Sequence, residues 1–346
     1  MRLDTSMIEV VVSNGLIESY RDDLEGAAES AAGPATIRWT YVPLNEAETR
    51  ERLVATADVW VSHVLRPAEA VRAHRLSLIA MPGVGTNGLA TQHLAREVEI
   101  VTAAFHGKAI AQFVLTTMSA LARRVIQADA ALRRGWWLNP IWNPEATITA
   151  SLDGATVGLI GFGEIGQEVA RLARAFDMNV MAVRSDPSRF ADDSPKPDWC
   201  GDVCELPVLL EAADYVVVSV PLTEETLGLI SAKEIEQMKP GAVLVNVARG
   251  GVVDPSPLYE GLRSGQLGGA AIDVWYAYPE HGAEAWPSRE PFWELDNVIL
   301  TPHLSGTSSD VFRARAHHLG SRIGEFARSR EAPETRGAVA PRDHPS

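Results

Sequence analysis

The sequence predicts an α/β protein built from two doubly wound parallel sheets. In its first third, short apolar runs that are typical of strands alternate with polar stretches of helical periodicity. The same alternation resumes from Thr156 to Thr301, and strands that alternate with helices pair in parallel. A chain of 346 residues is also long enough for two domains.

The first series of apolar runs predicts five strands, near Glu9–Val12, Thr36–Val42, Val59–His63, Leu76–Met81 and Glu99–Thr102. The turn that follows the fourth strand contains Gly83, Gly85 and Gly88. Glycines at this spacing expose backbone N–H groups, which can form a concave binding site for a carboxylate. A plain strand-to-helix turn is the alternative interpretation.

One long helix is expected from Gly107 to Arg134, because apolar residues recur there at helical spacing and no proline interrupts them. It leads into a proline-broken arm that contains Trp136, Trp137 and Trp142. These tryptophans either pack into the core or form an oligomer contact, since aromatic residues are enriched at interfaces. We expect a homodimer, which is the commonest closed oligomer.

The apolar run Thr156–Ile160 ends in Gly161-x-Gly163-x-x-Gly166, and a helical pattern follows it. The first glycine permits a tight turn, the second lets the backbone approach a pyrophosphate, and the third lets the helix pack closely on the strand. The first turn of that helix offers unpaired N–H groups and a positive dipole end to phosphates. Strand, glycine turn and helix in this order predict dinucleotide binding rather than a turn without a ligand.

Five further strands are expected near Asn179–Arg184, Asp214–Val220, Ala242–Val247, Gly269–Val274 and Asn297–Thr301, which makes a six-stranded sheet with the strand before the glycines. A last helical pattern runs from Val311 to Arg328. The tail Glu331–Ser346 is rich in proline and charge, and we expect it to be disordered.

The composition excludes several classes of function. A formal net charge of −14 argues against broad nucleic-acid binding. No apolar run is long enough to span a bilayer, and the N-terminus lacks the apolar core of a signal peptide. The two cysteines, Cys200 and Cys204, supply neither a disulfide framework nor a complete zinc site. We therefore expect a cytoplasmic protein without a metal and without a nucleic-acid or membrane partner.

Several segments together resemble the D-isomer-specific 2-hydroxyacid dehydrogenases, a family that includes phosphoglycerate, glycerate, D-lactate and formate dehydrogenases. The matching segments are Val157–Gly166, Val218–Thr223, Lys239–Asp254, Gly268–Val274 and Thr301–Gly306. The resemblance implies a Rossmann NAD(P)-binding domain (104–302) inserted into a flavodoxin-like substrate domain (1–103 and 303–330), followed by the tail (331–346). It also implies an active site in the cleft between these domains.

The resemblance implies an NAD(P)-dependent oxidoreductase that interconverts a small anionic 2-oxo acid and its D-2-hydroxy acid. Arg249 matches the family's substrate-binding arginine, and a planar guanidinium can hold a carboxylate with two hydrogen bonds. His303 matches the family's acid–base histidine. An imidazole titrates near working pH, so it can donate a proton in reduction and accept one in oxidation.

One catalytic position departs from the family. Five residues after Asp273, where most members have glutamate and formate dehydrogenases have glutamine, this chain has Tyr278. A tyrosine can hydrogen-bond an imidazole but supplies no negative charge near neutral pH, so we expect a lower pKa for His303 than in glutamate-bearing relatives. Glu280 is the alternative partner for His303. Two other functions stay open: formate-dehydrogenase-like oxidation of a small anion, and a non-catalytic dinucleotide-sensing binding protein.

The strand after the glycine turn ends at Arg184, where NAD-binding proteins carry a ribose-binding acid. An arginine can pair with a 2′-phosphate, so we expect NADP(H) to be favoured over NAD(H). Asp186 argues for NAD(H), although it equally suits a turn cap. The family pattern places the cofactor contacts at Gly161, Phe162, Gly163, Glu164, Ile165, Gly166, Arg184, Ser185, Val220, Pro221, Thr226, Val247, Ala248 and Asp273.

Five further residues are expected to bind the substrate: Val84, Gly85, His106, Lys108 and Arg66. The first two lie in the glycine-rich turn of the substrate domain. The other three could read a second anionic group on the substrate. For Lys108 and Arg66, a solvated surface charge is the alternative.

Overall fold

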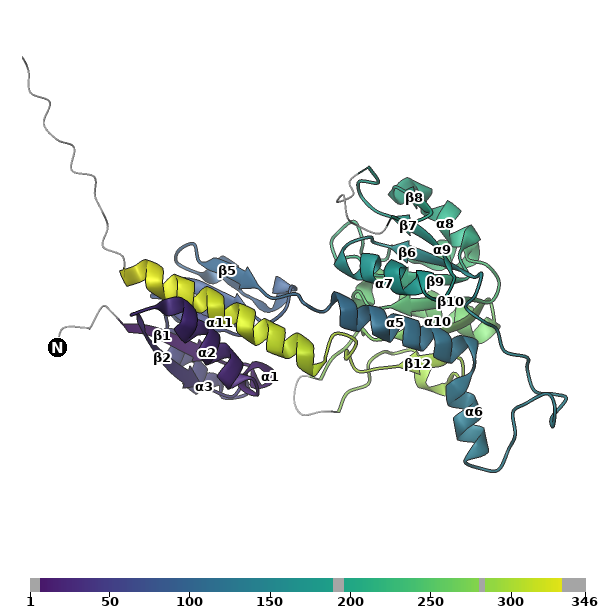
Figure 1. Cartoon of the computed structure of the whole chain (residues 1–346), viewed down its shortest axis with the longest axis horizontal. Helices are drawn as coiled ribbons and strands as arrows, with labels where there is room; N and C mark the ends of the chain where they lie inside the picture. Colours follow the sequence, from purple (N-terminus) through teal and green to yellow (C-terminus); the bar gives the residue numbers. More distant parts are fainter. Residues whose placement is uncertain (1–6, 189–195, 280–283, 332–346) are drawn as a thin grey trace, which may run out of the picture. The chain divides into compact units, whose positions relative to one another are not determined.

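The computed structural model describes residues 7–188, 196–279 and 284–331 of the chain. It divides into two compact units (Figure 1): unit 1 is Met1–Phe105 with Ser308–Ser346, and unit 2 is His106–Thr307. Each unit contains a parallel sheet and helices, which confirms the predicted α/β fold class. The dividing points place His303 in unit 2. The expected disordered tail and the candidate Glu280 lie outside the described residues, apart from Glu331.

Unit 1 has a five-stranded sheet in the order β2-β1-β3-β4-β5, and every neighbouring pair is parallel. The chain runs from β1 to β2 on one side and then crosses to β3 on the other, so the winding direction reverses between β1 and β3. The strands are β1 (Met7–Val12), β2 (Thr36–Tyr41), β3 (Val59–Val61), β4 (Leu78–Met81) and β5 (Glu99–Thr102).

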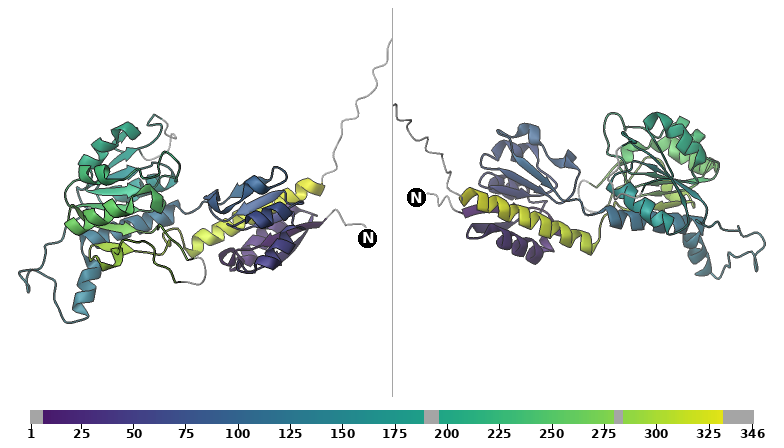
Figure 2. Two further views of the ribbon diagram at one scale, coloured as in Figure 1. Left: turned by 180° about the vertical axis from the view of Figure 1, so that it is seen from behind. Right: turned by 45° about the horizontal axis from the view of Figure 1, so that its top comes forward.

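Helices cover both faces of this sheet. The long C-terminal helix α11 lies along α2, as both Figure 1 and Figure 2 show in yellow and purple. These two helices enclose one apolar cluster with the sheet, and a second cluster on the other face contains Val54, Trp60 and Leu76. The helices are α1 (Gly15–Glu18), α2 (Arg21–Ala32), α3 (Ala47–Val54), α4 (Pro67–Arg72) and α11 (Ser309–Glu331), with 3-10 turns at Thr86–Gly88 and Thr91–His93.

Unit 2 has a seven-stranded parallel sheet in the order β12-β11-β10-β9-β6-β7-β8. Six of these strands were expected from the sequence; the seventh, β8, is a three-residue edge strand that pairs with β7. The winding direction reverses between β6 and β9. The strands are β6 (Thr156–Ile160), β7 (Asn179–Val183), β8 (Trp199–Gly201), β9 (Tyr215–Val218), β10 (Ala242–Asn246), β11 (Leu267–Ile272) and β12 (Val298–Leu300).

The helices of unit 2 form a layer on each face of its sheet. Helices α5 and α7 pack together over one apolar cluster, while α8, α9 and α10 cover the other. The helices are α5 (Gly107–Ala122), α6 (Val125–Leu132), α7 (Glu164–Arg174), α8 (Leu206–Ala212), α9 (Ala232–Gln237) and α10 (Pro255–Ser264), with 3-10 turns at Val203–Glu205, Gly250–Val252 and Phe292–Glu294.

The prediction of one helix from Gly107 to Arg134 is wrong. The chain bends by 59° between α5 and α6, and Arg124 takes a left-handed backbone conformation with φ 49° at the break. No glycine or proline marks this break, so the periodicity continues across it. Among the described residues no single helix meets the length and hydropathy needed to cross a membrane, although the bent α5–α6 pair does.

The tryptophans of the arm after α6 do not enter the core of unit 2. Trp136, Trp137 and Trp142 are 67%, 56% and 64% exposed, and Trp137 and Trp142 stack edge to face at 5.2 Å between ring centroids. Val125, Ile126 and Leu132 of α6 are also about half exposed. This excludes core packing for the arm, and the oligomer contact stays a prediction.

Candidate active site

The glycine turn between β6 and α7 has the shape that a dinucleotide requires. Gly161 has φ 98°, a conformation that side chains disfavour, and a Cβ there would lie 2.9 Å from Val220 Cγ1. A Cβ on Gly166 would collide with the carbonyl oxygen of Gly161. At Gly163, by contrast, a Cβ would meet no protein atom within 4 Å, so the turn is open on the side where a pyrophosphate approaches. The turn also lies where the sheet reverses its winding, and its residues therefore fit a dinucleotide.

Several other candidate cofactor residues use their side chains within the protein. The Phe162 side chain is buried in the core, and Ile165 packs against the same cluster. Glu164 Oε1 accepts the Gly107 N–H at 3.3 Å and thereby joins the starts of α7 and α5. Val247 and Ala248 are buried at the end of β10. The backbone is what Phe162, Val247 and Ala248 can offer a cofactor.

The loop after β9 is closed by its own hydroxyl groups. Thr226 Oγ1 donates to the Pro221 carbonyl at 2.6 Å and accepts the Thr223 N–H at 2.8 Å. Thr226 thus supports the shape of the loop that carries Val220 and Pro221, the two expected cofactor residues.

The end of β7 carries the residues expected at the adenosine ribose. Arg184 follows the strand, and its N–H donates to the Gly201 carbonyl at 3.1 Å. Ser185 is exposed. Asp186 Oδ1 accepts the Ser188 N–H at 3.1 Å and the Ser188 hydroxyl at 2.6 Å. Asp186 therefore caps the turn, which is the alternative role that its position suggested.

Arg249 follows β10, and the Asn246 side chain holds the backbone turn that carries it. The buried Asn246 side chain accepts the Ala248 N–H at 3.1 Å and donates to the Arg249 carbonyl at 3.3 Å. One guanidinium nitrogen of Arg249, Nη1, donates to the Ala248 carbonyl at 2.7 Å. Burial is the main cause that lowers the pKa of His303 and raises the pKa of Tyr278, and the positive charge of Arg249 acts on both groups, so these three side chains belong to one electrostatic cluster.

His303 sits in a strained backbone conformation that Asp273 holds. Its φ is 59°, in the left-handed region that a histidine rarely adopts. The fully buried Asp273 carboxylate accepts hydrogen bonds from the Thr301 hydroxyl at 2.6 Å, the Leu304 N–H at 2.8 Å and the Ser305 N–H at 2.9 Å. These contacts lie on both sides of His303. The family pattern places Asp273 among the cofactor contacts, and no local motif predicts this clamp, because its bonds join residues about thirty positions apart.

Tyr278 meets His303 directly. Tyr278 Oη lies 2.9 Å from His303 Nδ1, and the same oxygen accepts the Trp275 backbone N–H at 3.1 Å. Because Oη accepts the Trp275 proton, its own hydrogen is available for Nδ1. When Oη donates this hydrogen, the neutral ring accepts at Nδ1 and carries its proton on Nε2, the nitrogen that faces away from Tyr278.

The protonation states of this pair follow from its surroundings. His303 lies at the surface of its unit, yet the protein atoms around it partly desolvate the ring and lower its pKa; Arg249 lowers the pKa further, and Asp273 opposes the shift. Burial raises the pKa of the Tyr278 phenol, so it stays protonated near neutral pH. The pair therefore rests as a neutral tyrosine and a neutral imidazole.

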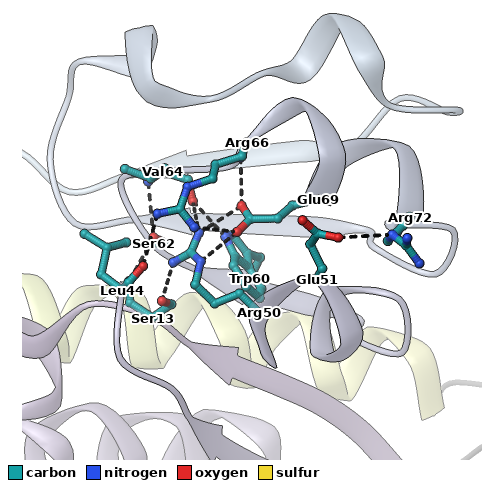
Figure 3. A network of polar contacts seen from close by, with 10 residues as sticks. All are labelled: Ser13, Leu44, Arg50, Glu51, Trp60, Ser62, Val64, Arg66, Glu69 and Arg72. Atoms are coloured by element: carbon teal, nitrogen blue, oxygen red, sulfur yellow. Dashed lines mark hydrogen bonds and ion pairs between the residues drawn. The ribbon is translucent and has the colours of Figure 1, made fainter. Parts of the chain in front are cut away.

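The expected substrate residues fall in different places. Val84, Gly85 and Arg66 belong to unit 1, whereas His106 and Lys108 lie at the start of α5 in unit 2. Val84 is exposed in the turn after β4, and Lys108 is exposed on α5. Arg66 Nη2 donates to the Leu44 carbonyl at 3.2 Å, and its Nη1 lies 3.3 Å from Glu69 Oε1 (Figure 3). Part of the Arg66 guanidinium is thus already used within unit 1.

Comparison with known proteins gives a consistent result. Residues 115–305 match the family model described as D-isomer specific 2-hydroxyacid dehydrogenase, NAD binding domain. The chain is 32% identical to the glyoxylate reductase of Pyrococcus furiosus over 267 residues, which are 76% of each protein. It is 33% identical to the hydroxypyruvate reductase of Thermotoga maritima over 250 residues, 72% of this chain and 76% of that protein. The crystal structure of the TT0316 protein from Thermus thermophilus superposes with a TM-score of 0.66 at 29% identity, covering 92% of this chain and 94% of the other.

Proposed function

The chain belongs to the D-isomer specific 2-hydroxyacid dehydrogenase family, and on that premise we propose that it reduces a small 2-oxo acid to the D-2-hydroxy acid. Relatives named glyoxylate reductase and hydroxypyruvate reductase support this direction and this size of substrate. A bound nicotinamide dinucleotide supplies the hydride for such a reduction. The glycine turn from Gly161 to Gly166 is the segment that would hold its pyrophosphate.

The observation that carries the proposal is the cluster of Arg249, Tyr278 and His303 in unit 2. Arg249 binds the substrate carboxylate, since its planar guanidinium suits a two-oxygen anion. Once its ring has taken up a second proton, His303 donates the proton on Nε2 to the oxygen at carbon 2 as negative charge develops there, and it returns to the neutral form. The amides of Val84 and Gly85, together with His106, Lys108 and Arg66, stay proposed substrate contacts.

Tyr278 lets His303 work in two protonation states. When the neutral ring carries its proton on Nε2, the hydroxyl donates to Nδ1. When the ring is protonated, Nδ1–H becomes a donor, and the hydroxyl can turn and accept it because a phenol has both capacities. After Nε2 gives its proton to the substrate oxygen, the ring is left with Nδ1–H against Tyr278. A glutamate carboxylate can only accept at Nδ1, so it would favour the forms of the ring that carry a proton on Nδ1.

We propose NADP(H) as the preferred cofactor. Arg184 stands at the end of β7, where a 2′-phosphate would need a cation. The carboxylate that would favour an unphosphorylated ribose, Asp186, already accepts two hydrogen bonds from Ser188. Both observations favour the phosphorylated cofactor.

The test of the function is the loss of nicotinamide absorbance with NADPH and NADH side by side. The panel of acids runs from glyoxylate, pyruvate and hydroxypyruvate to acids with a second carboxylate or a phosphate. Turnover of at least one acid is expected, faster with NADPH. Tight dinucleotide binding without any turnover would instead favour the sensing protein.

A second candidate, formate oxidation, is favoured by one feature, the neutral His303. Removal of a hydride from formate leaves carbon dioxide and requires no proton donor, so a histidine with a lowered pKa is no obstacle. The same assay run with formate and the oxidised cofactors distinguishes it, because only this activity produces reduced cofactor from formate.

We also propose that the protein is a homodimer that pairs through α6 and the arm after it. Many of the exposed apolar side chains lie there, among them Ile126, Trp136, Ile141 and Trp142. A surface pocket of about 520 Å³ beside α6 is lined in part by Ile126, Trp136 and Leu138. Light scattering of the purified protein tests this: a dimer mass is expected, and Trp136→Glu with Trp142→Glu should reduce it to a monomer mass.

A further inference from the structure

Glu164 is an acidic residue in the segment of unit 2 where a dinucleotide places its phosphates. It directly follows Gly163 and is the first residue of α7. The N-cap of α7 is Gly163, which has no side chain that could cap the helix, so the first N–H groups of α7 are left for an anion. The pyrophosphate and Glu164 therefore bring like charges to the same helix start.

The Glu164 side chain binds the start of a second helix. Its Oε1 accepts the N–H of Gly107, the first residue of α5, at 3.3 Å. The N-cap residue of α5, His106, makes no capping hydrogen bond with its own side chain, so Glu164 supplies this cap from α7. The positive end of the helix dipole also favours a carboxylate at this place.

The carboxylate is held close to both helix starts. A Cβ on Gly107 would lie 2.7 Å from Glu164 Cγ and 2.8 Å from Oε1, so only glycine at position 107 leaves room for this contact. Helices α5 and α7 also pack together, as Figure 1 shows. Glu164 therefore keeps its charge beside the glycine turn while its oxygen caps α5.

The charge of Glu164 can act on a bound cofactor. Within residues 7–188, 196–279 and 284–331, no lysine, arginine or histidine forms an ion pair with Glu164, whereas Glu168, one turn later on α7, pairs with Arg171 at 2.9 Å. Repulsion between unit charges several ångströms apart, in a setting between bulk water and a protein surface, corresponds to about a tenfold loss of affinity.

We infer that Glu164 sets the strength of dinucleotide binding, because its carboxylate repels the pyrophosphate at the start of α7. Weaker binding speeds the release of the spent cofactor, and product release limits turnover in many enzymes. The pyrophosphate is common to both nicotinamide cofactors, so Glu164 weakens NADPH and NADH equally. This separates its role from that of Arg184, which is proposed to select the 2′-phosphate. The effect concerns the cofactor alone and holds for any 2-oxo acid.

The experiment measures the Kd of NADPH and of NADH by fluorescence titration of the full-length protein, without a 2-oxo acid. Glu164→Gln removes the charge but keeps the size of the side chain and an oxygen that can accept the Gly107 N–H. Because Glu164 is exposed, this replacement leaves the core intact. Glu164→Asp keeps the charge, and Glu168→Gln removes the same charge from the next turn of α7 as the matched control.

Glu164→Gln is expected to bind NADPH and NADH about tenfold more tightly than the native protein does. This gain should shrink at about 0.5 M salt, because salt screens the repulsion between exposed charges. The Kd of Glu164→Asp should be no lower than the native value, and that of Glu168→Gln should stay within about twofold of it. Stopped-flow displacement should show slower release of the cofactor from Glu164→Gln, since most differences in affinity lie in koff.

An unchanged Kd in Glu164→Gln would overturn the role of Glu164. Equal tightening in Glu168→Gln would show an effect of the net charge and would remove the assignment to the helix start. A gain in Glu164→Gln that is the same at low and high salt would exclude charge repulsion as its cause. If the native protein bound neither dinucleotide, the cofactor assignment itself would fail, and not only the role of Glu164.

Discussion

The replacement Tyr278→Glu tests the protonation chemistry of the site most directly. The native phenol oxygen lies 2.9 Å from His303 Nδ1; glutamate is shorter than tyrosine, so its carboxylate should lie roughly 4–6 Å from the charge of the protonated ring. Two opposite unit charges at about 4 Å attract by about 1 kcal/mol in water and about 4 kcal/mol near a protein surface. One pKa unit corresponds to about 1.4 kcal/mol, so the pKa of His303 should rise by about one to three units.

The sign of the effect on activity follows from the direction of the reaction. Reduction needs the protonated ring, so kcat/KM is constant below the pKa of His303 and falls above it. In the native protein that pKa is below its ordinary value because of partial burial and Arg249, so the fall begins at acidic pH. In Tyr278→Glu the fall should begin about one to three pH units higher, and activity near pH 7 should rise.

The assay is the pH dependence of kcat/KM for 2-oxo acid reduction, with Tyr278→Gln as the matched control. Glutamine has the same size and reach as glutamate but no charge, so its profile should stay close to that of the native protein. Identical profiles for the Glu and Gln variants would refute the reasoning, because the charge would then have no effect on His303. A native profile that begins to fall only above pH 7 would refute the lowered pKa.

Three further outcomes are expected. Arg249→Lys loses the two-point carboxylate contact and should raise KM about tenfold to a hundredfold in steady-state reduction, with a far smaller change in dinucleotide affinity measured by fluorescence titration. Asp273→Asn replaces one acceptor oxygen by an NH₂ donor that faces the Leu304 or Ser305 N–H. The free energy of unfolding measured in urea should therefore fall by about 1–3 kcal/mol, and kcat should fall because the His303 loop loosens. An unchanged free energy of unfolding would contradict the clamp. Arg184→Ala should reduce the NADPH-to-NADH ratio of kcat/KM about tenfold, and an unchanged ratio would remove Arg184 from cofactor selection.

Much of the fold could be predicted because the sequence repeats a simple pattern. The strands from β1 to β7 and from β9 to β12 were all predicted, and the central ones, such as β4 and β9, are apolar because they are buried along their whole length. The strand β8 is as short as β12 and also lies at an edge, but its residues are Trp-Cys-Gly instead of the Val-Ile-Leu of β12, so it offers little strand pattern. The break at Arg124 contains neither glycine nor proline, so the sequence carries no local signal for it.

The residues of the site also fall into those that the sequence predicts and those that it does not. Gly161, Arg249 and His303 stand in motifs that can be read along the chain, and counting from Asp273 located Tyr278. The clamp of Asp273 on Leu304 and the bond of Glu164 to the Gly107 N–H join residues 31 and 57 positions apart. Contacts of that range depend on which strands and helices become neighbours in the fold, and no local spacing encodes them.

The left-handed backbone of His303 has a consequence for how this residue can be probed. A left-handed backbone conformation, such as that of His303, is about 1–2 kcal/mol less favourable than a right-handed one for an ordinary residue. The difference is close to zero for glycine and smaller for asparagine than for most other residues. Alanine at position 303 therefore removes the imidazole and also favours a flip of the loop that would release Leu304 and Ser305 from Asp273. Asparagine removes the imidazole while tolerating the native backbone. The difference in activity and stability between His303→Ala and His303→Asn thus separates the chemical contribution of this side chain from its conformational one.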